Sequence, residues 1–179
     1  MNFAFVGPGA VLCALATALT VAGCSPSLDW RETRAEGVGV VALFPCRPDR
    51  HVRPVTVAGA STTMEMLVCS AAGATFALSF LDMADPAAVT AAVSELRATA
   101  LANIAGTQLV TTPMQVSGMT ANPQAARLSM TGRLPDGTAT QEQAAFFVKG
   151  LRVFQASVIG AKLVPEMTDT FFAGLKLPS

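Results

Sequence analysis

An apolar run near the N-terminus determines how much of this chain can enter a folded domain. Residues 11–23 read VLCALATALTVAG, and the first charged side chain after them is Asp29. A helix needs about 20 apolar residues to cross a bilayer core of about 30 Å, so this run is too short to span a membrane. Its length is that of the hydrophobic region of a secretory signal peptide. We therefore expect residues 1–23 to be removed from the 179-residue chain, which leaves 156 residues.

The run ends in VAGC (21–24), two small residues followed by a cysteine. This tetrad resembles the lipobox of bacterial lipoproteins, in which the cysteine receives a thioether-linked diacylglycerol. The resemblance implies lipidation at Cys24, a short tether over 24–29, and outer-membrane sorting through Ser25. It implies a protein of the bacterial cell envelope, anchored by lipid and facing the periplasm. The first ten residues carry no Lys or Arg, unlike the family pattern. A buried core helix and secretion with cleavage elsewhere are the alternatives.

Composition limits the functions of residues 30–179, which we expect to form one globular α+β domain. Lys plus Arg and Asp plus Glu number 12 each, so the chain has no net charge to attract a polyanion. One Trp and no Tyr leave few rings for stacking on nucleobases. We therefore expect no nucleic-acid partner. The expected partners are the membrane, through the N-terminal lipid, and a second envelope protein.

Segments of alternating or continuous apolar character recur along the domain and predict β-strands. The expected strands are 30–33, 38–44, 52–58, 64–70, 75–81, 125–131, 140–149 and 152–159, with an irregular extended segment over 108–119. Pro54 places the strand 52–58 at a sheet edge, because proline lacks a ladder donor. Turn signals at 71–73 and 134–137 predict two hairpins.

Two helices are expected beside these strands. Asp85 is a good N-cap and Pro86 suits the first helical position, which predicts a long helix over about 86–105. Apolar residues recur there at spacings of three or four and form one stripe. Pro165 begins a short C-terminal helix over 165–173. The order of elements predicts an antiparallel β-sheet with both helices packed on it.

Cysteine usage indicates a disulfide. Cys13 leaves with the signal peptide and Cys24 carries the lipid, so Cys46 and Cys69 remain as a pair in an oxidising compartment. Both lie at the ends of predicted strands that we expect to be neighbours. A zinc site that combines the two thiols with His51 is the alternative, although it lacks a fourth ligand.

The strand that begins at Trp30, the strand that ends in Phe44-Pro45 and the Asp85-Pro86 helix start give the domain a resemblance. The order of elements resembles small bacterial lipoproteins with a PsbP-like fold, named for an extrinsic subunit of the oxygen-evolving complex. The segments around Cys46 and Cys69 resemble uncharacterised proteobacterial envelope proteins. These resemblances imply no catalytic residues.

No constellation for catalysis is visible in the sequence, and we expect neither an enzyme nor a cofactor or metal site. The single imidazole, His51, lies in an arginine-rich segment read as an exposed loop. Arg47, Arg50 and Arg53 are candidate contacts for anionic lipid head groups. The favoured function is a structural or partner-binding envelope lipoprotein, and the alternative is a carrier of small apolar ligands. A pocket of several hundred cubic ångströms favours the carrier, and a filled core with an exposed apolar patch favours the partner-binding protein.

Overall fold

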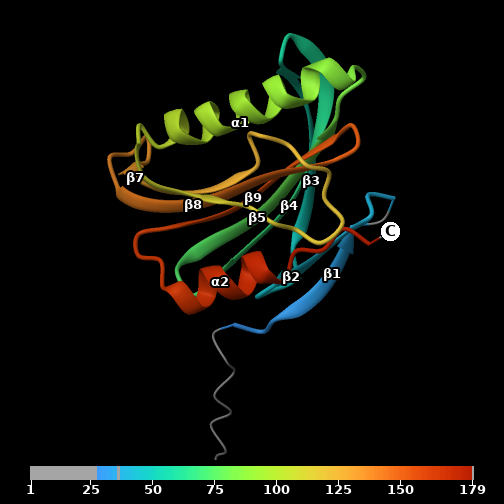
Figure 1. The fold of residues 1–179 in the computed structure, drawn as a ribbon. Coiled ribbons are helices and arrows are strands. Elements are labelled where there is room, and N and C mark those ends of the chain that lie inside the picture. Colours follow the sequence, from blue (N-terminus) through green and yellow to red (C-terminus); the bar gives the residue numbers. More distant parts are fainter. Residues whose placement is uncertain (1–27, 36, 179) are drawn as a thin grey trace, which may run out of the picture.

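The computed structural model describes residues 28–35 and 37–178, and within them seven strands form one antiparallel sheet. Figure 1 shows this sheet as the middle layer of the molecule. In spatial order the strands are β3 (Asp49–Val57), β4 (Ala60–Ala71), β5 (Ala74–Asp82), β9 (Arg152–Gly160), β8 (Ala139–Lys149), β7 (Ala126–Arg133) and β6 (Thr107–Pro113). The α+β class is confirmed. Cys24 and the expected signal peptide lie outside the described residues.

The sheet consists of two meanders that meet at its centre. β3, β4 and β5 form the first, β6 to β9 form the second, and β5 pairs with β9. The central register places Phe80 opposite Phe154 and Leu78 opposite Ala156. In the described part of the chain β3 and β6 are the edge strands. The edge position of β3 agrees with the expectation from Pro54.

Helix α1 (Val89–Asn103) connects the two meanders and is shorter than the helix expected over 86–105. A 3-10 turn, η1 (Pro86–Ala88), precedes it. The Asp85 carboxylate accepts a hydrogen bond from the Ala87 amide at 2.8 Å, so this residue caps the 3-10 turn instead of the α-helix. The proline-led start was therefore located correctly, but the first turn is wound more tightly than an α-helix.

Both faces of the sheet are buried, and each has a different cover (Figure 1). α1 packs on one face in a cluster that includes Leu128, Phe146 and Val153. The other face is covered by α2 (Pro165–Ala173) and by a hairpin of β1 (Arg31–Ala35) and β2 (Val40–Phe44). The strand expected over 38–44 thus belongs to a separate two-stranded sheet in the described structure.

Aromatic rings join the parts of the second cover to the sheet. The Phe171 ring of α2 lies 5.4 Å from the Phe44 ring of β2 and 5.4 Å from the Phe76 ring of β5, both edge-on. Such edge-to-face pairs add to the stabilisation from burial. In the segment that follows α2 in the sequence, the backbone of Lys176 exchanges two hydrogen bonds of 2.9 Å with the backbone of Val41. The hairpin, α2 and the C-terminal segment therefore form one continuous layer.

Both hairpins of the first meander turn through an alanine–glycine pair in the left-handed region. The φ angles are 50° and 74° at Ala58-Gly59, and 51° and 75° at Ala72-Gly73. Positive φ at both turn residues matches the twist of the flanking strands. Alanine is disfavoured there because its Cβ approaches the following carbonyl oxygen, whereas asparagine and glycine adopt this conformation more readily.

We expect Ala72→Asn to raise the free energy of unfolding by about 1 kcal/mol, because it relieves this strain without changing the strands. Urea unfolding of the wild type and the variant measures the difference. Ala121→Asn is the matched control, since Ala121 is exposed and lies outside the positive-φ region. An equal gain at both positions would contradict the argument from turn geometry.

Candidate binding cleft

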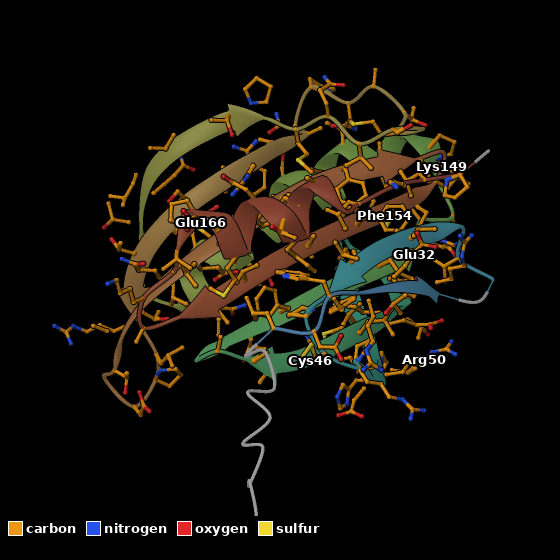
Figure 2. The ribbon with its side chains drawn as sticks, turned by 90° about the horizontal axis from the view of Figure 1, so that it is seen from below. Glu32, Cys46, Arg50, Lys149, Phe154 and Glu166 are labelled. Carbon is orange, nitrogen blue, oxygen red and sulfur yellow. A yellow bond between two sulfur atoms is a disulfide. The ribbon has the colours of Figure 1, made fainter. Side chains whose placement is uncertain are left out.

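A cleft of about 390 Å³ opens between the β1–β2 hairpin and strands β3 and β4. Its rim is charged, with Arg31, Glu32 and Arg34 on the β1 side and Arg47, Arg50 and Glu65 on the opposite wall. Its floor is apolar and consists of Val38, Leu67 and Phe80, and Thr33, Ala35 and Pro48 complete the lining. Figure 2 looks onto this side of the molecule, with the lining residues Glu32 and Arg50 on the side away from Glu166 of α2.

The burial of one face of β2 positions the hairpin beside this cleft. Val40, Ala42 and Phe44 alternate along β2 and all pack into the core on this side of the sheet. β1 pairs with β2 from Arg31 opposite Phe44 to Ala35 opposite Val40. Within the described residues β1 has no second neighbouring strand, so its outer edge borders the cleft. The cleft is therefore the corner of the main sheet that the narrow hairpin leaves uncovered.

A disulfide fixes one end of the hairpin to the main sheet. The sulfur atoms of Cys46 and Cys69 are bonded to each other, with their Cα atoms 6.0 Å apart. Cys46 follows β2, and Cys69 lies on β4 within the core. Because both sulfur atoms are in the disulfide, neither is available as a thiolate ligand for the alternative zinc site. The bond holds the cleft wall that follows Cys46 against the sheet.

We expect loss of this disulfide to lower the free energy of unfolding by roughly 3 kcal/mol, because the unfolded chain gains the entropy of an open loop. Urea unfolding with and without dithiothreitol measures the effect in the wild type. The double variant Cys46→Ser/Cys69→Ser is the control, and dithiothreitol should not change its stability. A wild type with the same midpoint in both buffers would show that the bond does not constrain the fold.

Arg152 fixes the other end of the hairpin. Its Nε and Nη2 donate to the two carboxylate oxygens of Asp82, each at 2.7 Å, and its Nη1 donates to the Val38 carbonyl at 2.8 Å. The hydrogen bond from Arg152 holds the pKa of Asp82 below its usual range, and the same pairing raises the pKa of Arg152. One guanidinium thus joins β5, β9 and the start of β2, so the cleft is held at both ends.

Ion pairs occupy part of the charged rim. Arg31 pairs with Asp29 and Arg34 pairs with Glu32, in both cases two residues away, and Arg50 pairs with Glu65 across β3 and β4. Arg47 pairs with no carboxylate among the residues that the structure describes. Exposed pairs of this kind contribute little to stability. Their guanidinium groups therefore remain available to a ligand at small energetic cost.

The arginine-rich segment was wrongly read as a loop. Arg50, His51 and Arg53 belong to β3, which pairs with β4 from Asp49 to Val57. Adjacent residues of a strand point to opposite faces. Arg50 therefore pairs with Glu65 at the cleft, whereas Arg53 donates to the Met64 sulfur at 3.9 Å beside the core under α1.

Of the three predicted anion contacts, only Arg47 and Arg50 line the cleft. His51 lies two residues from Arg53 and so shares its face of the sheet. Arg31, Arg34 and Glu65 were missed, because their approach to Arg47 and Arg50 depends on where the hairpin docks. The available signal was the cluster of charged residues among small ones over 31–35, which is typical of a mostly exposed strand.

Glu142 is a buried carboxyl outside the cleft. It is 6% exposed on β8, between Met130 of β7 and Ile159 of β9 in the register. Burial raises its pKa from 4.5 to about 7. The described residues offer it no hydrogen bond or ion pair, and its oxygen atoms are not fully enclosed. The cost of burying the charged form is therefore offset only by the remaining contact with solvent.

We expect the stability of the wild type to fall as the pH rises from about 4.5 to about 7, by up to about 3 kcal/mol. In that range the folded protein keeps a proton on Glu142 that the unfolded chain has released, so rising pH favours unfolding. Glu142→Gln should remove this part of the pH dependence, as measured by urea unfolding at several pH values. Glu166→Gln, at an exposed position of α2, controls for the loss of one carboxylate. The same slope in wild type and Glu142→Gln would refute the assignment.

Neither a metal site nor a membrane-spanning helix is found in the described ranges. Residues 28–35 and 37–178 contain no group of three or more His, Cys, Asp or Glu placed to hold a metal ion. None of their helices is both long and apolar enough to cross a bilayer. Comparison with known proteins finds no matching family model and no matching curated protein.

Proposed function

We propose that the chain is a lipid-anchored protein of the bacterial cell envelope that acts by binding and not by catalysis. The observation that carries the binding role is the cleft, because an apolar floor with a few convergent polar groups and a volume of about 390 Å³ is typical of a small-ligand site. The lipobox-like tetrad at 21–24 supports the anchor, and Ser25 supports an outer-membrane location facing the periplasm. Kinship with the PsbP-like lipoproteins is part of the same proposal.

Lipidation at Cys24 would keep the cleft close to the bilayer. Leu28 already packs against the core on the hairpin side, and the Asp29 amide donates to the Pro45 carbonyl at 2.8 Å. Four residues span at most about 14 Å when fully extended. The end of the hairpin that leads into Arg31 therefore lies within that distance of the lipid, and this orients the cleft toward compounds at the membrane surface.

Docking of a second envelope protein is the other candidate function, and the edge strand β6 favours it. All residues of β6 are exposed, including Leu109 at 59% and Val110 at 53%. An edge strand offers unpaired backbone N–H and C=O groups to an added strand. The exposed apolar side chains would then be buried in the complex.

We expect the wild type to incorporate an alkyne-tagged palmitate in growing cells and to sediment with the membrane fraction. Cys24→Ala should lose the label and leave the membrane fraction, because the acceptor thiol is gone. Cys13→Ala is the matched control and should keep both properties. An unlabelled wild type, or a label that survives in Cys24→Ala, would overturn the lipid anchor.

A further inference from the structure

The lining of the cleft has an apolar part and a charged part. Val38, Leu67 and Phe80 form its floor and are at most 9% exposed, so only a small part of each side chain is accessible from the cleft. Arginines stand on both walls above this floor. A ligand that fills the space would meet apolar side chains below and guanidinium groups at the rim.

The guanidinium groups at the rim favour an anionic head group. Four arginines and two glutamates line the cleft. Asp29, which pairs with Arg31 beside the cleft, reduces the excess of positive charge but does not remove it. Each guanidinium has five N–H donors, and pairing with one carboxylate leaves some of them unused. Arg47, which has no carboxylate partner in the described structure, keeps its whole donor set. Planar forks of this kind bind carboxylate, sulfate and phosphate groups well.

The floor and the volume favour a single alkyl chain as the rest of the ligand. Clefts that bind small molecules measure roughly 300 to 1,000 Å³, and 390 Å³ is near the lower end of that range. An extended peptide added to the free edge of β1 would use backbone groups. It would leave the charge of Arg47 on the facing wall, which no carboxylate of the described residues balances, without a role.

We propose that this cleft binds one molecule of an anionic single-chain amphiphile, with its acid group at Arg31 and Arg47 and its alkyl chain on Val38, Leu67 and Phe80. The ligand is taken as a free monomer, such as a fatty acid. The inference rests on the proposed binding role of the cleft and not on lipidation of Cys24. The inference adds the chemical class of the ligand, which the proposed binding role does not specify.

The test compares three ligands with the same alkyl chain and different head groups. Laurate, dodecanol and dodecyltrimethylammonium are titrated calorimetrically, below their micelle concentrations, into the full chain carrying Cys24→Ala. We expect one laurate per protein, with dodecanol and the cation binding at least about tenfold more weakly. Equal affinity for all three would show that the arginines do not recognise the head group and would overturn the proposal. Absence of laurate binding would overturn it too, whatever the outcome for Cys24.

Charge reversal locates the site. Arg47→Glu should weaken laurate binding about tenfold or more, and the milder Arg47→Gln should weaken it less. Arg133→Glu is the matched control, because Arg133 is exposed on β7 and outside the cleft. All variants keep residues 1–23, so they differ from the reference protein only at the substituted arginine. Unchanged affinity in Arg47→Glu with an unchanged melting temperature would exclude this cleft.

A photoreactive laurate shows where the ligand binds, and lipid vesicles distinguish a free amphiphile from a bilayer surface. Cross-linking should label peptides that contain Val38 or Leu67, and excess laurate should prevent it. Labelling that is confined to other peptides would contradict the proposal. Binding to phosphatidylglycerol vesicles without binding to monomeric laurate would identify a bilayer surface as the ligand and would overturn the free amphiphile. If an unrelated extended peptide displaced laurate, then the edge of β1, and not the arginine rim, would select the ligand. That result would overturn the proposal.

Discussion

A sheet that is apolar on both faces must be covered twice, and this requirement organises the molecule. The middle of the chain supplies one cover, α1, as it crosses from the first meander to the second. The two ends of the described chain supply the other, since β2 and α2 meet where Phe44 and Phe171 pack edge-on. A hairpin and a short helix are narrower than seven strands, so they leave a corner of the sheet open. The cleft follows from this mismatch in width.

The main elements were predictable because their signals are local. Alternation, turn residues and proline positions located nearly every strand and both helices, and Pro54 marked an edge of the sheet. The first turn of α1 was not predictable in detail, because a capping aspartate before proline suits a 3-10 turn as well as an α-helix. The pairing of β5 with β9 lay beyond local reasoning, since it joins strands about 70 residues apart along the sequence.

The cleft could not be predicted from the sequence, because it also depends on contacts between segments that are distant along the chain. Arg47 and Arg50 were recognised as anion contacts, but Arg53 was grouped with them although strand geometry sends it to the opposite face. Arg31 joins the site only when the hairpin docks on β4, which depends on the disulfide and on Arg152. Glu142 shows the same limit, since a carboxyl within a run of strand residues gives no sign of how deeply neighbouring strands bury it.

The position of the disulfide also bears on how the domain would resist mechanical load. Tension applied through an N-terminal attachment reaches Leu28 first and then peels β1 away from β2. Further pulling would draw β2 out of the core, until the extended chain reaches Cys46. There the covalent bond to Cys69 transfers the force to β4, inside the seven-stranded sheet. The hairpin would therefore unfold before the seven-stranded sheet. The sheet would keep its register while the segment before Cys46 extends.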